Sequence, residues 1–423
     1  MLARAAGRPA PLTPEPTVPG APFPRSRIPP PCPVNKPLLA LLLGAFALGS
    51  AEFGTVGLIP SLGHQLQRSS DELGWLVAVY AIGVTVGAPL LTRLLQRFDT
   101  RATLAVSMAA AGALTALITA SDHFGLLLAA RALLGANHGL FFSLAMPLAG
   151  RLSPRSTIEG MAQVVSGLTI AIVLSIPIMG FVSDHYRWQA AFWLLAGAYL
   201  LAAAAMWRWL PAGAGAREAG AHTVRFVQVA SNPRVLSALI KIVLLFGGYF
   251  IAYTYLPKLI IDSLGYSQDG ANALLLLFGL GVVVGNHVGG MAAARFGTAR
   301  TIGFNYALIA ALFLAIYALV GLPPAAYAGI LVLGLFAMSA TPSLGHYGIE
   351  VSRRLIPGSA EIASSLTVSG YNIGIALGSL VGGAVLRQVG LNQVLVVAAA
   401  VIGLGLVVNA LEQRADRRLG MAI

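Results

Sequence analysis

A glutamate, an arginine and a histidine lie inside long apolar stretches of this chain, where ionisable side chains are costly. Glu52 is the one carboxylate of the stretch LLLGAFALGSAEFGTVGLIPSLG, residues 41–63. Arg131 and His138 both fall in the apolar segment 124–150, seven residues apart, which places them on one face of a helix. An intramembrane carboxyl group beside a permanent cation and an imidazole is suited to binding and releasing a proton. The alternative is a purely structural ion pair between Glu52 and Arg131.

Two opposing influences act on the Glu52 carboxyl group. Burial in hydrocarbon favours its neutral form, whereas a neighbouring arginine and cavity water favour its charged form. Counted at roughly 1.5 Å per residue, Glu52 lies about 12 Å and Arg131 about 10 Å below the same end of their helices. We therefore interpret Glu52 as the principal proton acceptor and Arg131 as its partner. His138 is either a second proton carrier or an inert packing residue.

The composition of the chain indicates which elements hold these residues. Of the 423 residues, 57% are hydrophobic and 10% are charged, whereas a soluble domain has about 25% charged residues. This composition predicts an all-α membrane protein, because a spanning helix needs about 20 apolar residues and bonds its own backbone groups. Twelve transmembrane helices are expected, at 37–60, 74–95, 101–120, 124–150, 160–183, 189–210, 235–258, 271–294, 299–321, 325–349, 359–386 and 391–411.

The basic residues indicate how these helices are oriented. The chain has 27 Lys and Arg residues and a net charge of +12. These basic residues lie between the apolar segments and form no basic face on a folded domain, which argues against a nucleic-acid partner. With both termini in the cytoplasm, only Arg68, Arg187, Lys258 and Arg387 fall in outer loops, as the positive-inside rule requires. Lys241 lies near the inner end of its segment and is expected to extend to the cytoplasmic face.

Three segments are expected to lie outside the membrane helices. Residues 1–36 form a Pro-rich tail, predicted to be disordered, that contains the single cysteine, Cys32. Residues 211–234 are predicted to be a cytoplasmic linker, and 412–423 a C-terminal tail. One cysteine excludes a disulfide framework, and the sequence has no Gly-rich phosphate loop ending in Gly-Lys-Ser or Gly-Lys-Thr. We expect no cofactor and no metal.

The two halves of the chain, 37–210 and 235–411, resemble one another. NKPLLALLLGAFALGSAEFGTVGLIP, residues 35–60, aligns with NPRVLSALIKIVLLFGGYFIAYTYLP, residues 232–257. YAIGVTVG likewise aligns with FGLGVVVG. We interpret the halves as six-helix bundles that are pseudo-repeats, an architecture in which one half rocks against the other around a midplane site.

The ionisable residues are not repeated. Tyr249 stands in the second half where the first has Glu52, and Gly334 stands where the first has Arg131. The repeated scaffold therefore does not itself require these charges. Asymmetric charge of this kind favours a functional role for them.

Three segments resemble bacterial transporters of the major facilitator superfamily, in the branch of drug and sugar efflux proteins that includes the arabinose type. They read LGSAEFGTVGLIPSL, RALLGANHGLFFSLAMPLAGRLSP and ASSLTVSGYNIGIALGSLVGGAV. The similarity covers about residues 36–411. It implies the major facilitator fold, proton-driven antiport of a small molecule by alternating access, and a bacterial inner-membrane location. Because this architecture encloses its own pathway, a monomer in the lipid bilayer is expected to be sufficient.

The same resemblance implies a cytoplasmic gate. The family's loop between helices 2 and 3 carries a Gly, an Asp-Arg pair, a second Gly and basic residues. In this chain Gln96 replaces the acid, and both glycines of the first copy are also replaced. The gate residues implied by the alignment of both copies are Gln96, Arg97, Arg101, Arg295 and Arg300.

The remaining candidates are aromatic or uncharged polar residues that would line a central cavity: Tyr80, Asn137, Phe141, Phe142, Tyr249, Tyr253, Met338 and Asn372. Such a lining suits an amphipathic or moderately apolar solute. The favoured function is proton-coupled export of a drug-like compound, a sugar or a metabolite. Proton-coupled uptake is the alternative within transport. A non-transporting sensor or assembly protein is the alternative outside it, although no extramembrane domain supports that reading.

Overall fold

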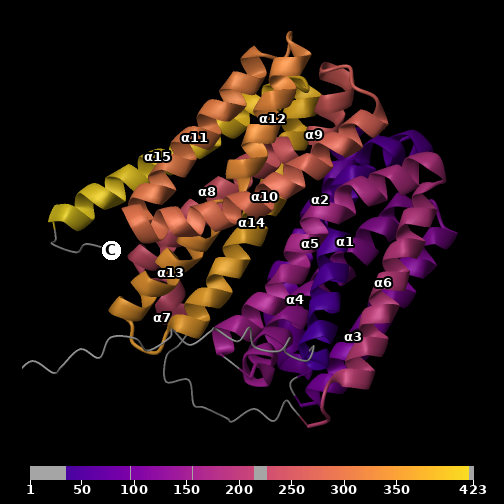
Figure 1. Ribbon diagram of the computed structural model, residues 1–423, viewed down its shortest axis with the longest axis vertical. Coiled ribbons are helices and arrows are strands. Elements are labelled where there is room, and N and C mark those ends of the chain that lie inside the picture. Colours follow the sequence, from indigo (N-terminus) through magenta and orange to yellow (C-terminus); the bar gives the residue numbers. More distant parts are fainter. Residues whose placement is uncertain (1–34, 96, 155, 214–225, 419–423) are drawn as a thin grey trace, which may run out of the picture. The chain divides into compact units, whose positions relative to one another are not determined.

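The computed structural model describes residues 35–95, 97–154, 156–213 and 226–418, and every regular element in these ranges is helical. Gln96, residues 1–34, most of the predicted linker and the last five residues lie outside them. The elements are α1 (Lys36–Leu66), α2 (Ser70–Leu95), α3 (Thr100–Leu117), the 3-10 helix η1 (Ile118–Ala120), α4 (Phe124–Leu152), α5 (Thr157–His185), α6 (Trp188–Trp209), α7 (Phe226–Ala230), α8 (Pro233–Tyr253), α9 (Leu256–Lys258), the π-helix η2 (Leu259–Ser263), α10 (Gln268–Phe296), α11 (Thr298–Ala318), α12 (Pro323–Ala337), α13 (Thr341–Leu355), α14 (Ala360–Gln388) and α15 (Gln393–Arg418) (Figure 1).

Twelve helical stretches in the described chain are long and apolar enough to cross a membrane, which confirms the predicted number of spans. Three of these stretches combine several elements: α3 with η1, α8 with α9 and η2, and α12 with α13. The ends differ from the predicted ones by a few residues. For example, α1 continues through Pro60 to Leu66 and ends where Gln67 adopts a left-handed φ of 52°.

The first helix of each half begins with the same kind of cap. The side chain of Asn35 accepts a hydrogen bond from the backbone N–H of Leu38, at 3.4 Å. The side chain of Asn232 accepts one from the N–H of Arg234, at 3.0 Å. Each asparagine is followed by a proline within the first turn, where the missing N–H costs nothing. These local signals fix the start of α1 and of α8.

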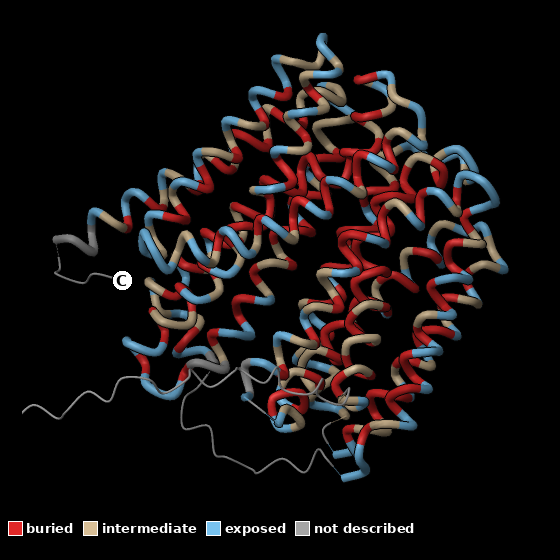
Figure 2. Tube along the Cα trace, viewed as in Figure 1, coloured by how far each residue is buried: buried red, intermediate tan, exposed pale blue. Residues whose placement is uncertain are grey.

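The helices form two sets, each packed around its own cluster of apolar side chains. Figure 2 shows the buried residues gathered in the interior of each set. In the first helix set, α1–α6, the main packing pairs are α1 with α5, α2 with α4, and α3 with α6. In the second helix set, α8–α15, they are α8 with α14, α10 with α12, and α11 with α15. Residues of α1, α2 and α5 also join the apolar cluster of the second helix set.

The two helix sets meet at one end of their helices. The contacts join α2 to α14, α5 to α10 and α1 to α9 (Figure 1). Asp71 at the start of α2 lies 3.7 Å from Arg387 at the end of α14. One turn along α2, Gly74 faces the hydroxyl group of Tyr255, which donates a hydrogen bond to the Ser379 carbonyl at 2.9 Å. A side chain at Gly74 would collide with this hydroxyl group.

The segment predicted to be a linker contains the short helix α7. Its Val229 is fully buried with Val235, Ile356 and Leu366 in a small apolar cluster of their own. The described end of the linker therefore packs against the second helix set.

Candidate functional site

Helices α1, α2 and α4 bring together Glu52, Tyr80, Arg131 and His138, which expose between 1% and 8% of their surface. Close packing of α4 against α2 makes this possible. A Cβ atom at Gly135 would lie 2.9 Å from the carbonyl carbon of Tyr80, so only glycine allows the two backbones to approach this closely. Gly135 lies between Arg131 and His138 along α4, and all three face α2.

Arg131 is held by backbone carbonyl groups of two other helices. Its Nε donates to the Leu76 carbonyl at 3.0 Å, and its Nη1 donates to the Ala51 carbonyl at 2.6 Å. The guanidinium carbon lies 4.2 Å from the centre of the Tyr80 ring, a cation–π geometry. The remaining nitrogen, Nη2, is buried without a hydrogen-bond partner in the described chain.

The expected direct pair between Arg131 and Glu52 is not formed. Arg131 interacts electrostatically with Glu52, but within the described residues no Arg131 nitrogen lies within 4.0 Å of the Glu52 carboxyl oxygens. The guanidinium instead bonds the carbonyl group of the preceding residue, Ala51. Arg131 therefore ties α4 to α1 while its charge remains close to the carboxyl group.

His138 is the ionisable side chain in direct reach of Glu52. Its Nδ1 lies 3.7 Å from Oε2 of Glu52 and 2.9 Å from the hydroxyl group of Tyr80. That hydroxyl group also donates to the Leu48 carbonyl at 3.2 Å. The Phe142 ring lies 5.0 Å from the imidazole, centre to centre. A carboxyl group, an imidazole and a phenol are thus close enough to exchange a proton with small side-chain movements.

Glu52 faces the second helix set. It interacts electrostatically with Tyr253 of α8. The next residue, Phe53, and Val56 one turn further both belong to the apolar cluster of the second helix set. Glu52 consequently lies where α1 meets the helices that would have to move relative to it.

Two of the predicted cavity residues are buried amides with an unused polar atom. Asn137 of α4 is 8% exposed, and its Nδ2 has no partner among the described atoms. Asn372 of α14 is 7% exposed and donates to the Val368 carbonyl at 3.0 Å, while its Oδ1 has no such partner. Each amide can therefore accept a hydrogen-bonding group of a solute or a water molecule.

The predicted aromatic residues separate into two groups. Tyr249 and Tyr253 stack at 4.9 Å between ring centres, and Tyr253 also stacks on Phe278 at 5.9 Å. Phe141 is fully buried in the core of the first helix set and contacts Phe142 edge to face at 5.2 Å. Met338 is 8% exposed in the second apolar cluster. Tyr253 is thus the aromatic candidate of the second helix set that interacts with Glu52, and Tyr249 stacks on it.

The predicted gate arginines contact groups within their own helix sets. Arg101 donates to the carbonyl group of Trp207 near the end of α6, and its guanidinium lies over the Trp207 ring. Arg97 lies over the adjacent Phe98 ring at 4.9 Å. Arg295 likewise lies over its neighbour Phe296. Arg300 makes no hydrogen bond, ion pair or ring contact with another described residue, so the gate function of these arginines stays a prediction.

Sequence reasoning missed a second buried charge pair. Lys241 of α8 was expected to extend to the membrane surface, but it is 1% exposed and forms an ion pair with Glu412 of α15. Its ammonium group also lies 3.6 Å from the centre of the Tyr347 ring. The prediction was wrong because Glu412 was assigned to a tail, whereas α15 continues through it to Arg418.

The model of the Major Facilitator Superfamily matches residues 41–360 of the chain. The chain belongs to this superfamily. It is accordingly a multi-pass membrane transporter of small molecules with twelve candidate spans. The resemblance inferred from the sequence is confirmed.

Named relatives are similar to this major facilitator protein over most of their length. The inner membrane transport protein YdhP of Escherichia coli K12 is 32% identical, over 90% of this chain and 97% of its own. The putative transporter AraJ of the same organism is 29% identical, over 82% of this chain and 86% of its own. A probable sugar efflux transporter of Helicobacter pylori G27 is 26% identical, over 83% and 88%.

A solved structure supports the fold of this major facilitator protein. It is the crystal structure of a bacterial homologue of the human lysosomal transporter Spinster, with a TM-score of 0.71. The match covers 89% of this chain and 96% of that one, at 14% sequence identity. At this identity the likeness concerns the fold alone.

Proposed function

We propose that this protein is a proton-coupled antiporter that exports a small organic compound, such as a drug-like molecule, a sugar or a metabolite, by alternating access. The observation that carries the proposal is the buried Glu52. It lies beside His138 and close to Arg131, and it faces Tyr253 across the boundary between the helix sets. An intramembrane carboxyl group in such surroundings is a functional residue by default. The similarity to a probable sugar efflux transporter of Helicobacter pylori agrees with export.

The proposed arrangement is two six-helix bundles, 37–210 and 235–411, as pseudo-repeats in a bacterial inner membrane. The distribution of Lys and Arg supports a cytoplasmic position of both termini. Under this orientation, Asp71 and Arg387 lie on the outer side. The contacts between the helix sets then close the outer end, and the solute path opens to the cytoplasm. The protein would act as a monomer because each chain contains both bundles.

In the proposed cycle, protonation of Glu52 weakens its attraction to Arg131 and His138. The neutral carboxyl group then tolerates the apolar surroundings of α1 and favours one rocking position. Binding of the solute near Tyr249 and Tyr253 favours the charged form in the other position. A proton and a solute that each favour opposite positions are coupled without direct contact between them.

The test uses purified protein in proteoliposomes with an imposed pH gradient. Labelled monosaccharides and amphipathic drugs are screened until one drives counterflow of protons, reported by an internal pH-sensitive dye. Glu52→Gln should then lose gradient-driven accumulation but retain solute exchange between the two sides. Glu72→Gln, which removes an exposed acid paired with Arg68, is the matched control and should behave as the wild type.

Two results would contradict this function. If solute and protons move in the same direction, the protein is an uptake symporter. If Glu52→Gln still accumulates solute against a gradient with unchanged pH dependence, Glu52 is structural and the coupling lies elsewhere.

A further inference from the structure

Two helix contacts join the helix sets at the end where they meet: α2 with α14, and α5 with α10. They lie at aligned positions of the two halves. The alignment of YAIGVTVG with FGLGVVVG, extended without a gap, places Gly74 of α2 at the position of Asn272 of α10. The alignment of VSGLTIAIVLSIPIMG with VSGYNIGIALGSLVGG places Gly383 of α14 at the position of Gly180 of α5. The two contacts can therefore be compared residue by residue.

The contact between α2 and α14 has opposite charges and a paired polar group. Its two glycines lie against the hydroxyl group of Tyr255, which donates a hydrogen bond to the Ser379 carbonyl at 2.9 Å. Next to them, the carboxylate of Asp71 lies 3.7 Å from the guanidinium group of Arg387. The charge pair favours closure of this contact, and the hydroxyl group keeps its partner when the contact is closed.

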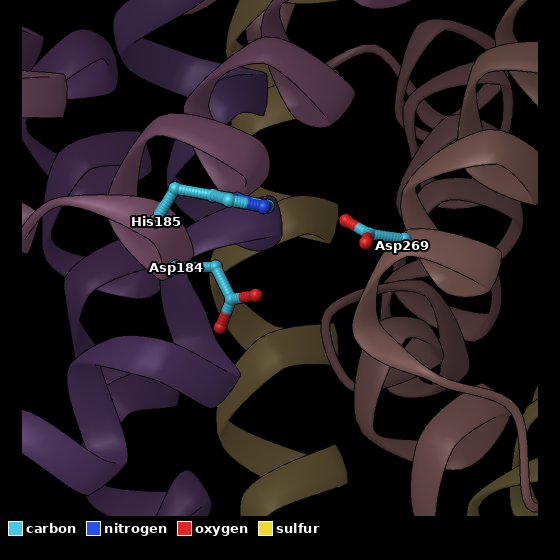
Figure 3. A group of neighbouring side chains, drawn as sticks. All are labelled: Asp184, His185 and Asp269. Carbon is cyan, nitrogen blue, oxygen red and sulfur yellow. The ribbon is translucent and has the colours of Figure 1, made fainter.

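The contact between α5 and α10 has like charges at the corresponding positions. By the same alignments, Asp269 stands where α2 has Asp71. Asp184 stands where α14 has Arg387. The carboxylate oxygens of Asp184 and Asp269 lie within 4.8 Å of each other, and Figure 3 shows both side chains facing one another across the contact, together with His185. Like charges this close repel each other, although only weakly because both side chains are exposed.

Asn272 adds an unpaired donor to the same contact. It is 6% exposed, and its Oδ1 lies so close to Gly180 that a Cβ atom there would be 2.5 Å away. Its Nδ2 makes no hydrogen bond with any residue that the structure describes. Separation of α5 from α10 would expose the amide to water, which offers an acceptor, whereas closure leaves the donor unpaired. The cost of this donor therefore arises only in the closed arrangement.

We propose that Asn272 and the Asp184–Asp269 pair oppose closure between α5 and α10 and so raise the fraction of molecules in which this end is open. The aligned residues of the other contact show that the helices can meet without an amide and without like charges. The proposal rests on alternating access, which is part of the proposed function, but not on proton coupling at Glu52 or on the solute. Purely structural residues would instead stabilise the contact.

The experiment uses the full-length protein in nanodiscs at pH 8, without solute or pH gradient, in a Cys32→Ser background. Ser379→Cys introduces a thiol at a fully buried position beside Tyr255. Its rate of alkylation by a membrane-impermeant maleimide reports how often this end opens.

Asn272→Leu removes the unpaired donor and should slow alkylation by about 5- to 150-fold, the equivalent of the 1–3 kcal/mol that such a donor costs. Asn272→Ala removes the donor without adding apolar surface and should slow alkylation by a smaller factor. Asp184→Arg creates the charge arrangement of the other contact and should slow alkylation by about two- to fivefold, the effect of an exposed ion pair.

Three control variants separate these effects from others. Asn409→Leu replaces a buried amide that lies within the second helix set and donates to the Ala299 carbonyl, and it should not slow alkylation. Ala273→Leu adds an apolar side chain at an exposed position next to Asn272 and should slow alkylation less than Asn272→Leu does. Asp122→Arg makes the same charge change at an exposed position outside the contact and should leave the rate unchanged.

A measurable rate that is unchanged or faster in both Asn272 variants would overturn the proposal and leave the proposed function intact. Equal slowing by Asn272→Leu and Ala273→Leu would assign the effect to added apolar surface and also overturn it. No alkylation in any variant would exclude opening of this end, and would thereby contradict alternating access as well.

Discussion

The hydrogen bond between Tyr80 and His138 can be isolated experimentally because it joins two helices through single side-chain atoms. Tyr80→Phe removes the hydroxyl group that lies 2.9 Å from Nδ1 of His138, and it leaves the ring under Arg131 in place. His138 is 7% exposed, so its Nδ1 then loses a partner that water cannot easily replace. A buried polar atom without a partner costs about 1–3 kcal/mol. We expect the free energy of unfolding to fall by about that amount.

A double-mutant cycle separates this bond from the other effects of the substitution. Tyr80→Phe, His138→Leu and the double variant are compared by reversible denaturation in detergent micelles. The coupling energy should be about 1 kcal/mol, the net value of one such hydrogen bond. Tyr186→Phe, which alters a tyrosine that is 71% exposed, serves as the reference. Additive effects, with a coupling energy below about 0.3 kcal/mol, would refute the proposed contact between α2 and α4.

Three further substitutions test the charge near Glu52, the buried ion pair of the second helix set and the contact between the two helix sets. Arg131→Ala removes the positive charge near Glu52 and should reduce proton-driven transport and change its dependence on pH. An unchanged pH dependence of transport would exclude the interaction between Arg131 and Glu52. Lys241→Met should lower the free energy of unfolding by about 3–5 kcal/mol, because it leaves Glu412 buried and unpaired. The double variant Lys241→Met/Glu412→Leu should recover most of this loss. Equal losses in the single and double variants would contradict the pairing. Asp71→Asn should weaken closure between α2 and α14 by about 0.2–1 kcal/mol. The measurement is the rate of labelling of a cysteine that replaces the buried Ser379 beside Tyr255, in a Cys32→Ser background, and slower labelling would be inconsistent with a closing role.

The sequence predicted much of the architecture because membrane helices have strong signals. Twelve apolar stretches of sufficient length correspond to the twelve helical stretches of the structure. Helical periodicity also placed Arg131 and His138 on one face of α4. Equal depth predicted that Arg131 lies near Glu52, because depth along a helix follows directly from the number of residues. His138 was added as a candidate because it shares a face of α4 with Arg131, and it lies 3.7 Å from the Glu52 carboxyl group.

Other features could not be obtained in this way because they depend on helix rotation and tertiary packing. Depth alone did not reveal that Arg131 bonds the Ala51 carbonyl and that the His138 imidazole lies 3.7 Å from the Glu52 carboxyl group. Tyr80 was predicted to line a cavity, but the close approach at Gly135 makes it a hydrogen-bond partner of His138. The pair of Lys241 and Glu412 joins helices far apart in sequence, and no local pattern predicts it.

The proposed coupling requires that Glu52 gains and loses a proton in the membrane. Infrared difference spectroscopy of the reconstituted protein, recorded while the bulk pH is changed, detects the carbonyl stretch of a protonated buried carboxyl group directly and needs no known substrate. We predict a carboxylic-acid band that titrates in the wild type and in Glu72→Gln but is absent from Glu52→Gln. A titrating band that persists unchanged in Glu52→Gln, or no difference between the three spectra, would contradict the account.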